Sequence, residues 1–481
     1  MNIKEFKKLA KPGTIIPVFQ KFNSDFITPV MAYLKLKEKG KYSFLLESVV
    51  RGEQVGRYSF MGQAPFMIQK FSGGKTILVR GAGNQIEQKN YFETLKDQLS
   101  KYKIVSVPEL PSFTCGAVGF IGYEMIGQIE RMPAPKTDVI ENDEALLAYY
   151  DHLIAFDHLK NEIILMANVF VDSNSDLEML FDEAQHRLAT IREKLNRPPH
   201  PDLNFNVDWT TEKQNFNKKD FLAAVDKAKE HIFAGDIFQD VLSQCFSVEY
   251  QGEPFQVYRA LRNINPSPYM FYLDFREYQV IGSSPEPLIR AFDSELEIVP
   301  IAGTRKRGKN DEEDKELAEH VMLVDLARND LGRISKHGTV RVHDFKTIQK
   351  YSHVMHIISH VKGELKPGLN AVDAFESSFP AGTVSGAPKI RAMEIIHELE
   401  PERRGIYAGS VGYFDYGGNM DMCIAIRTLV ASKGKIFYQA GAGIVADSVP
   451  ENEYEETINK TKALRRAVEE AAGGLNDLIY R

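Results

Sequence analysis

The sequence predicts an α+β fold built on antiparallel sheets. Candidate strands occur in adjacent runs, such as residues 152–171 and 409–439, instead of alternating regularly with helices as βαβ units do. No Gly-x-Gly-x-x-Gly motif follows a strand and opens a helix, which argues against a doubly wound dinucleotide-binding sheet. The 481 residues are 43% hydrophobic and 26% charged, an ordinary globular balance that suits two or three domains or one large composite.

The first 195 residues form an N-terminal region of mixed strands and helices. Residues 42–50 are an apolar run typical of a strand, and residues 116–123, rich in glycine and aromatics, predict a tight strand pair. Two apolar runs in residues 152–171 flank a polar break at 160–162 and predict a hairpin. Residues 177–195 have strong helical periodicity.

A linker-like segment at 196–218 separates this region from a C-terminal region at 219–481. It carries Pro198, Pro199 and Pro201, followed by polar residues with little periodicity. Beyond it, helices are predicted at 219–234, where Gly235 ends the helix, at 311–329, which has an acidic first turn, and at 451–472. Strands are predicted near 340–343, 351–361, 409–414, 423–429 and 435–439.

Composition excludes several classes of partner. The net charge of -7 argues against nucleic acid, because phosphate binding usually needs a basic face. The three cysteines are far apart and form no CxxC pair, which favours a reducing compartment and argues against zinc. The N-terminus lacks the apolar core of a signal peptide, and no apolar run approaches the ~18 residues of a membrane span. We therefore expect a cytoplasmic protein with no membrane partner.

Two Glu-x-x-Glu pairs are candidate metal ligands. Glu316 and Glu319 lie on one face of a predicted helix, and Glu453 and Glu456 repeat the spacing on the last helix. Together, four carboxylates suit Mg²⁺, which prefers a few oxygen ligands completed by water and substrate. Taken singly, such a pair is most often a solvated helix face, and that alternative stays open.

Glycine-rich segments and an arginine are candidate anion sites. The segment Gly441, Ala442 and Gly443 predicts a loop whose backbone N–H groups cradle an anion, or a simple turn at a strand end. A second such loop is predicted at 302–304. Arg427 ends the apolar strand 423–426; its planar fork binds a carboxylate bidentately, or it lies at a sheet edge without a ligand.

Three histidines, His353, His356 and His360, cluster on one segment. No His-Glu-x-x-His motif is present, and on a strand His353 and His356 point to opposite faces, so a shared metal is not expected. Two interpretations remain open. One of these histidines acts as a general acid, or all three are packed in the core.

Five long stretches, in order, resemble the chorismate-utilising enzymes, and within them those that make anthranilate. They are PIAGTR at 300–305, ELAEHVMLVDLARND at 316–330, YSHVMH at 351–356, FPAGTVSGAPK at 379–389 and GIYAGSVGY at 405–413. The glycine segment at 440–445 and the glutamates after it complete the match, which is dense over 220–470 and sparse over 10–170. The resemblance implies two large antiparallel sheets packed as a sandwich and surrounded by helices.

The resemblance also implies roles for individual residues. Glu319 and Glu456 look like the principal Mg²⁺ ligands, supported by Glu316 and Glu453, with the metal on the ring carboxylate of chorismate. The remaining substrate and catalytic residues it implies are Tyr407, Arg427, Gly441, Ala442 and Gly443 for the enolpyruvyl carboxylate, Gly303 and Thr304 along the ring, Lys460 as a further contact, and His356 and Thr383 near the C4 hydroxyl. His356 is then the acid that helps this hydroxyl leave.

Two positions indicate which chorismate chemistry is performed. Aminodeoxychorismate synthases tend to place a nucleophilic lysine where this chain has Ala302, and isochorismate and salicylate synthases place a water-activating lysine where it has Gln239. Neither residue supports those reactions. The resemblance thus implies that ammonia adds directly to chorismate, giving anthranilate and pyruvate, the first committed step of tryptophan biosynthesis. The alternatives are component I of an aminodeoxychorismate synthase and a non-catalytic tryptophan-binding regulatory subunit.

The resemblance further implies regulation and a partner. Glu47, Ser48, Pro268, Tyr269 and Met270 resemble the family's tryptophan pocket, which implies feedback inhibition; a plain packing seam is the alternative. The chain has no glutaminase region, which implies a separate glutamine amidotransferase subunit that supplies ammonia, in a heterotetramer of two large and two small subunits.

Overall fold

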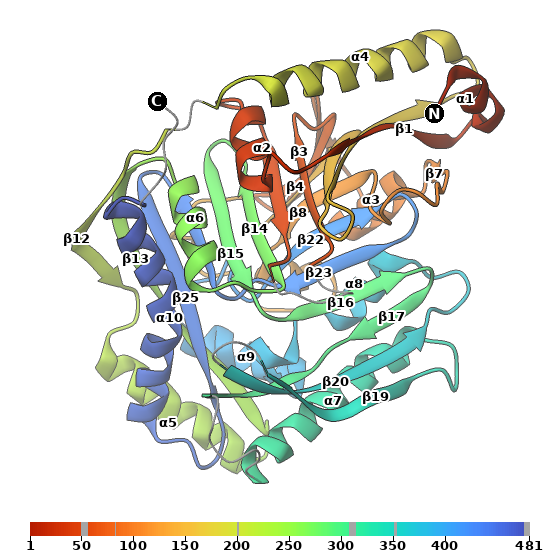
Figure 1. Cartoon of the computed structure of the whole chain (residues 1–481). Helices are drawn as coiled ribbons and strands as arrows, with labels where there is room; N and C mark the ends of the chain where they lie inside the picture. Colours follow the sequence, from red (N-terminus) through yellow and green to blue (C-terminus); the bar gives the residue numbers. More distant parts are fainter. Residues whose placement is uncertain (50–55, 82, 200–201, 307–313, 351–353, 476–481) are drawn as a thin grey trace.

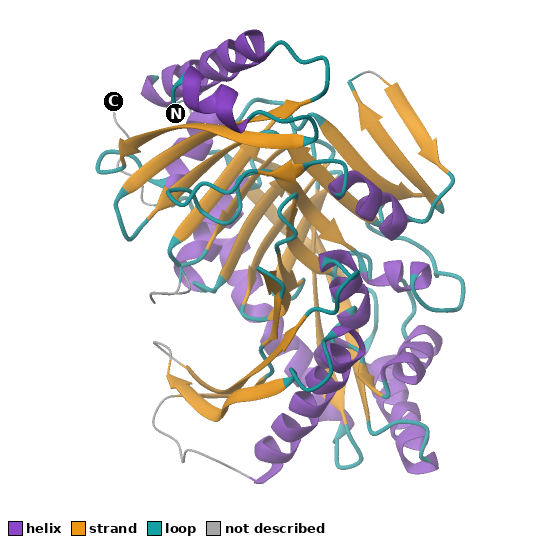
Figure 2. Ribbon diagram, turned by 90° about the vertical axis from the view of Figure 1, so that its right-hand side faces the viewer, coloured by secondary structure: helices purple, strands orange, loops and turns teal. Residues whose placement is uncertain are grey.

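Two large, mostly antiparallel sheets form the centre of the molecule, and helices surround them, which confirms the predicted fold class (Figure 1). The computed structural model describes residues 1–49, 56–81, 83–199, 202–306, 314–350 and 354–475. Within these ranges one strand pair, β1 (Thr14–Asn23) with β7 (Lys103–Ile104), is parallel. Figure 2 shows the helices on the outer sides of the strand layers.

The larger sheet has 13 strands in the described part of the chain. Its order is β12 (Phe205–Gln214), β13 (Gln239–Gly252), β25 (Lys435–Ile444), β24 (Thr428–Ser432), β15 (Tyr278–Ser284), β14 (Tyr269–Asp274), β2 (Ser43–Glu47), β3 (Tyr58–Gln63), β10 (His152–Asp157), β11 (Glu162–Val171), β1 and β7, with β21 (Gly386–Ala387) beside β13.

The second sheet has 12 described strands. Its order is β18 (Ile301–Lys306), β20 (Val354–Glu364), β17 (Glu295–Ile298), β16 (Pro287–Phe292), β23 (Met420–Ile424), β22 (Ser410–Asp415), β8 (Gly116–Ile121), β9 (Ala145–Tyr150), β4 (Met67–Ser72), β5 (Lys75–Arg80) and β6 (Gly83–Glu87), with β19 (Arg341–Lys350) beside β20.

The helices cover the outer faces of both sheets. They are α1 (Ile3–Leu9), α2 (Pro29–Leu36), α3 (Tyr91–Leu99), α4 (Leu177–Asn196), α5 (Lys218–Ala234), α6 (Phe255–Ile264), α7 (Asp314–Ile334), α8 (Ala371–Ser378), α9 (Lys389–Leu399) and α10 (Pro450–Ala472), with short 3₁₀ turns η1 (Tyr123–Gln128) and η2 (Gly382–Val384). Helices α1, α2, α4, α5, α6, α9 and α10 pack on the larger sheet, and α3, α7 and α8 pack on the other.

Aromatic and branched side chains from both sheets meet in the layer between them. Phe44 and Phe271 of the larger sheet lie in one buried cluster with Val118, Phe120 and Leu146 of the other. Each such side chain contributes about 1.5–3 kcal/mol when fully buried, so this layer is the main cohesion between the sheets.

The N-terminal and C-terminal regions share both sheets. In the larger sheet β2 of the N-terminal region pairs with β14, and in the second sheet β8 pairs with β22. Part of the linker-like segment at 196–218 forms strand β12. The division at 195 and 219 therefore stays a prediction about function, while the sheets run continuously across it.

Local signals explain where the best-predicted elements begin and end. Helix α5 begins after Asn217, whose side chain accepts a hydrogen bond from the backbone N–H of Asp220 at 3.0 Å, and ends at Gly235 with φ of 84°. The predicted hairpin at 152–171 is confirmed as β10 and β11. Pro450 opens α10, where a missing N–H costs nothing.

Three predictions of local structure are wrong. Residues 116–123 are one strand, β8, followed by η1 rather than a strand pair, because the sheet supplies partners on both sides. The glycine segments at 302–304 and 441–443 are strands, not loops. The predicted strand at 423–429 breaks after Ile424, so Arg427 lies between β23 and β24 with φ of 52°, not at a strand end after 426.

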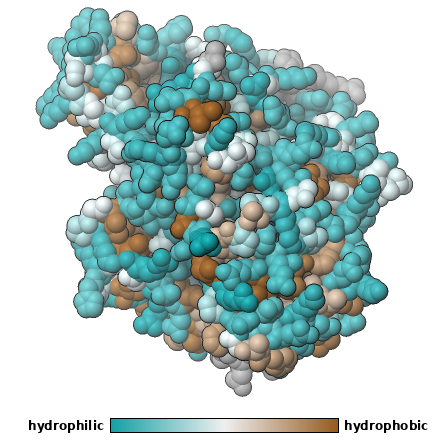
Figure 3. Space-filling model, turned by 180° about the vertical axis from the view of Figure 1, so that it is seen from behind, coloured by the Kyte–Doolittle hydropathy of each residue, from teal (hydrophilic) through white to brown (hydrophobic). Residues whose placement is uncertain are grey.

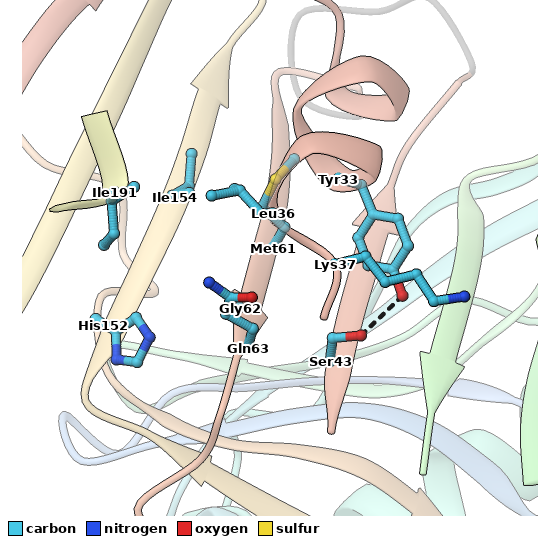
Figure 4. A pocket seen from close by; sticks show the side chains of 10 residues that line it. All are labelled: Tyr33, Leu36, Lys37, Ser43, Met61, Gly62, Gln63, His152, Ile154 and Ile191. Carbon is cyan, nitrogen blue, oxygen red and sulfur yellow. Dashed lines mark hydrogen bonds between the residues drawn. The ribbon is translucent and has the colours of Figure 1, made fainter. Parts of the chain in front are cut away.

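Hollows outside the candidate sites differ widely in size, and one of about 400 Å³ is lined by Gln214, Cys245, Glu402 and Lys433 among others. The face in Figure 3 is mainly hydrophilic, with apolar side chains in scattered patches. No helix in the described ranges is long and apolar enough to cross a membrane. A cavity of about 10 Å³ lies under α2. Among the side chains that line it, Tyr33 and Ser43 share a hydrogen bond of 2.8 Å (Figure 4). Such a void admits one water at most.

Candidate active site and regulatory cavity

Lys460 on α10 links two of the predicted functional segments to a carboxyl group that was not predicted. Its Nζ donates a hydrogen bond to the Gly441 carbonyl at 2.9 Å and pairs with Glu456 Oε1 at 2.7 Å, one helical turn earlier. Its charge also reaches Glu286, at the start of β16. The structure therefore brings the glycine segment, the last helix and Glu286 to one place.

Glu286 is a functional candidate that sequence reasoning missed. It lines a cavity of about 40 Å³ together with Leu326, Gly382 and Thr383. Burial raises the pKa of Glu286 to about 8, although the Thr383 hydroxyl and the charge of Lys460 oppose the rise. At neutral pH this carboxyl is mostly protonated and is a proton donor. The available signal was a lone acid between Pro285 and Pro287.

Thr383 lies in the same cavity, as the prediction of a catalytic role requires. Its Oγ1 is buried and lies close enough to the Glu286 carboxyl to lower the pKa of that group, but it makes no hydrogen bond of regular geometry within the described residues. A buried hydroxyl left unpaired costs about 1–3 kcal/mol, so its retention beside a cavity points to a ligand that completes the bond.

Tyr407 and Arg427 are the candidate anion-binding residues of the site. The Tyr407 hydroxyl accepts the N–H of Gly441, and burial raises the pKa of this tyrosine to about 12. Arg427 is half-buried, and no carboxylate pairs with it in the described part of the chain. Burial lowers the pKa of Arg427, and only Tyr407 opposes that effect. A partly desolvated guanidinium without a counter-ion is suited to a substrate carboxylate.

A buried arginine fixes Tyr407 from below. Arg404 is 1% exposed, pairs with Glu400 Oε2 at 2.9 Å and donates to the Val384 carbonyl at 2.6 Å. Its guanidinium lies 5.7 Å from the Tyr407 ring centroid. It thereby ties η2, which carries Thr383, to the segment that carries Tyr407.

The glycine segment presents its backbone from a strand edge. Strand β25 pairs with β24 only as far as Tyr438, so beyond that residue one edge is open. The N–H and carbonyl of Gly441 point to this edge, toward Tyr407 and Lys460, and alternation places those of Gly443 on the same side. Ala442, between them, is fully buried against α5 and α10.

A larger residue is excluded at Gly441 by backbone atoms, whereas at Gly443 it would have to displace the Gln239 side chain. A Cβ on Gly441 would lie 2.8 Å from the Tyr407 hydroxyl and 2.9 Å from the Leu242 carbonyl, and one on Gly443 would lie 2.8 Å from Gln239 Nε2. The predicted loop does not exist, and the anion cradle stays a prediction: the N–H of Gly441 is donated to Tyr407, while the N–H of Gly443 lies at the same strand edge. Gln239 lies against it, as the comparison of nucleophiles requires.

A β-bulge brings the backbones of Gly303, Thr304 and His356 together. Ala302 pairs with Ile357 and Arg305 pairs with Met355, so the two residues between them oppose His356 alone. The side chains of these residues and the whole of His353 lie outside the described structure. His360, four residues along β20, pairs instead with Glu297 at 2.9 Å.

The four predicted metal ligands lie on two helices. Glu316 and Glu319 are in the first turns of α7, where only the backbone is described, and Glu453 and Glu456 are in the first turns of α10. The described side chains alone form no cluster of three metal-ligating groups. Carboxylate oxygens suit Mg²⁺, and the exposed Glu456 side chain, now on Lys460, is available to one.

All five residues of the predicted tryptophan pocket line one cavity of about 100 Å³. The Ser48 hydroxyl there is buried without a partner in the described structure. Glu47 is already paired, since its carboxylate accepts hydrogen bonds from Tyr258 at 2.5 Å and Arg262 at 3.1 Å. Tyr413, Asp421 and Cys423 form the opposite wall, and sequence reasoning missed them.

Comparison with known proteins shows the family to which this chain is similar. Residues 50–466 match the family described as chorismate binding enzyme. The chain is 46% identical to anthranilate synthase component 1 of Acetivibrio thermocellus and 46% identical to that of Aquifex aeolicus, covering 98% of itself and of each relative. It superposes on anthranilate synthase component I of Streptococcus pneumoniae TIGR4 with a TM-score of 0.78 and 37% identity, over 93% of this chain and 99% of that one. The isochorismate synthase MenF of Escherichia coli, 20% identical over 97% of this chain and 98% of its own, has the same fold with a TM-score of 0.71.

Proposed function

The chain belongs to the chorismate-binding enzyme family, and on that premise we propose that it is the large subunit of an anthranilate synthase, which converts chorismate and ammonia to anthranilate and pyruvate. The observation that carries the proposal is Arg427, a half-buried cation without a counter-ion in the described residues, beside Tyr407 and the open N–H edge of β25. Chorismate has a carboxylate on its enolpyruvyl group, and this is where we place it. We expect the enzyme to act in the cytoplasm.

Chorismate has a second carboxylate, on its ring. We propose that a Mg²⁺ ion held by glutamate side chains of the protein binds this ring carboxylate. Glu319 and Glu456 would hold Mg²⁺, with Glu316 and Glu453 in support. When bound, the ion supplies positive charge that draws electrons from the ring at C2. Lys460, which now pairs with Glu456, would keep its hydrogen bond to the Gly441 carbonyl if Glu456 held the ion.

The chain's own acids serve the departing C4 hydroxyl. His356 is the donor that the sequence assigns, and Glu286, protonated up to about pH 8 beside Thr383, is a second donor that the geometry adds. Protonation converts hydroxide into water as leaving group, and general acid help contributes about 10²–10⁴ in rate. Comparing single variants at the two positions decides which one gives the proton.

Ammonia adds at C2 without help from a covalent adduct. Ala302 provides no nucleophile, and Gln239, which lies against Gly443, is neither charged nor a base at neutral pH. Loss of the C4 hydroxyl, and then of pyruvate with a ring proton, leaves the aromatic product. Aminodeoxychorismate synthesis would stop before pyruvate is lost, so product identity separates the two.

The assay uses the purified chain with chorismate, MgCl₂ and an ammonium salt, followed by anthranilate fluorescence and pyruvate release. We expect both products in equal amounts, and EDTA should abolish both. Consumption of chorismate without anthranilate would refute the proposal, as would folded protein that is inert to chorismate.

We further propose that tryptophan binds the 100 Å³ cavity and inhibits the enzyme. The unpaired Ser48 hydroxyl and the backbone at Pro268–Met270 would hold its polar end. Ser48→Ala should weaken tryptophan binding about tenfold, as expected for a lost hydrogen bond in a buried site, while the uninhibited rate stays within about twofold. An inhibition curve that matches the wild type would refute the assignment.

The name component 1 of the relatives supports a second component, and we propose a glutamine amidotransferase subunit in a heterotetramer. By itself, this subunit should therefore make anthranilate with ammonium salts as the nitrogen source but not with glutamine. Adding the matching amidotransferase should restore glutamine-dependent activity.

A further inference from the structure

The regulatory and catalytic cavities share one wall. In β23, Asp421 and Cys423 line the regulatory cavity, whereas Ile424 lines the cavity of Glu286 and Thr383. Alternate residues of a strand face opposite sides of a sheet, so this one strand contacts both cavities. The backbone of Ile424 also donates to the Glu286 carbonyl at 3.0 Å.

Arg290, on the neighbouring strand β16, holds the regulatory side of this wall. Its Nε donates to the Tyr269 hydroxyl at 2.7 Å and to Asp421 Oδ1 at 3.3 Å, and Tyr269 itself donates to Asp421 at 2.8 Å. Tyr269 and Asp421 both line the regulatory cavity. The guanidinium is therefore fixed by two groups that a ligand in this cavity would contact.

On its other side Arg290 reaches the strands of the catalytic cavity. Its Nη1 lies 3.4 Å from Glu297 Oε2 on β17, and Glu297 accepts a hydrogen bond from His360 at 2.9 Å. Burial disfavours the charged form of Glu297, but the hydrogen bond from His360 and the charge of Arg290 lower its pKa to about 2, so it stays ionised. The next residues, Ile298, Val299 and Pro300, line the catalytic cavity.

The same network reaches the strand of the predicted acid. His360 lies on β20, which also carries His356, and Glu297 pairs with Lys362 of that strand in register. A shift of Glu297 thus moves both the lining segment 298–300 and the strand that presents His356. Charge-assisted hydrogen bonds connect Asp421, Arg290, Glu297 and His360 without a gap. Such bonds are stronger than neutral ones, so they hold the relative positions of these side chains firmly.

We infer that Arg290 is the positioning residue through which occupancy of the regulatory cavity changes the catalytic cavity. The inference rests on the proposed inhibition by tryptophan. An amino acid in the cavity brings an ammonium group to Asp421, where it competes with Arg290 for the carboxylate. Arg290, released from Asp421, pairs more fully with Glu297 and draws β17 and segment 298–300 with it. A ligand shifts an equilibrium only through such unequal contacts in the two states.

The test separates binding from inhibition. For wild type and Arg290→Gln, the tryptophan Kd is measured by calorimetry and the inhibition midpoint by the ammonia-dependent assay. We expect Arg290→Gln to bind tryptophan within about threefold of wild type, while the midpoint rises about tenfold or inhibition becomes partial, a loss within the usual range of coupling energies. Glu295→Gln is the matched control, since its carboxylate pairs with Lys362 at 2.7 Å on the same two strands but does not contact Arg290.

Three outcomes overturn the inference. Unchanged inhibition of Arg290→Gln removes it, and so does an increase in Kd equal to that of the midpoint, because Arg290 would then be a binding contact only. Wild type that binds no tryptophan refutes the regulation itself and is recognised before any variant is made. If Arg290→Gln fails to fold, Glu297→Gln, which lines neither cavity, must show the same separation of Kd from midpoint.

Discussion

At the scale of single residues, unpaired polar groups mark the site more clearly than residue types do. Arg427 and Ser48 each lack a partner in the described structure, Thr383 makes no hydrogen bond of regular geometry there, and each lies at a predicted ligand position. The sequence drew attention to Arg427 by its place after an apolar run, whereas Thr383 and Ser48 were found through resemblance, because a lone threonine or serine has no distinctive pattern. It could not find Glu286, since its raised pKa arises from burial by segments distant in sequence.

Arg427→Lys should raise KM for chorismate about tenfold or more and leave the fold intact. Lysine keeps the charge but loses the planar fork that pairs with a carboxylate in two bonds. Steady-state kinetics with ammonium salts measures the effect. A KM equal to that of wild type would place the enolpyruvyl carboxylate elsewhere.

Glu286→Gln should slow the reaction by about 10²–10⁴, because the amide cannot give a proton. In the wild type the acid form of Glu286 is present below its pKa of about 8 and is lost as the pH rises through it. The plot of log kcat/KM against pH should therefore fall above about 8, and the fall should be missing in the variant. A wild-type rate for Glu286→Gln would leave His356 as the donor.

At the scale of elements, periodicity located helices well and mistook glycine-rich strands for loops. Helix α5 and helix α10 begin and end within a residue or two of their predicted limits, because capping residues and Gly235 act locally. Gly441 and Gly443 are paired with β13, a partner that the local sequence does not reveal. The bulge at Gly303 and Thr304 likewise depends on β20.

Gly441→Ala tests whether the strand edge is the substrate cradle. The new methyl group would meet the Tyr407 hydroxyl and the Leu242 carbonyl at under 3.0 Å, and forcing such a contact costs about 1–3 kcal/mol. We expect a lower melting temperature and loss of most activity. Gly434→Ala, at a turn with φ of 75°, is a control that strains the backbone away from the site; equal loss of activity in both would attribute the effect to stability alone.

At the scale of the whole molecule, the two sequence regions depend on each other. The sandwich was predicted through resemblance, whereas the interleaving of strands from both regions in both sheets was not, since strand order is set by long-range pairing. Without residues 1–195, β14 and β22 each lose a neighbouring strand, and the layer between the sheets loses Phe44 and Phe120.

A fragment of residues 219–481 should therefore not fold by itself. We expect no cooperative thermal transition in circular dichroism and no ammonia-dependent activity from the isolated fragment. Co-expression with residues 1–195 should restore both, because the missing strands return to their partners. A cooperative transition in the fragment alone would show that the boundary at 195–218 separates independent folding units.

The strand β23 has a consequence for how this enzyme can change over generations. It is five residues long, and its alternating side chains line both the proposed inhibitor cavity and the proposed catalytic cavity. Selection on a toxic tryptophan analogue would then favour substitutions on the far wall of the regulatory cavity, at Leu46, Ser48 or Met270, where release from inhibition leaves turnover intact. A substitution in β23 itself would relieve inhibition but also lower turnover. Strains that overproduce tryptophan should therefore keep the sequence of β23 unaltered.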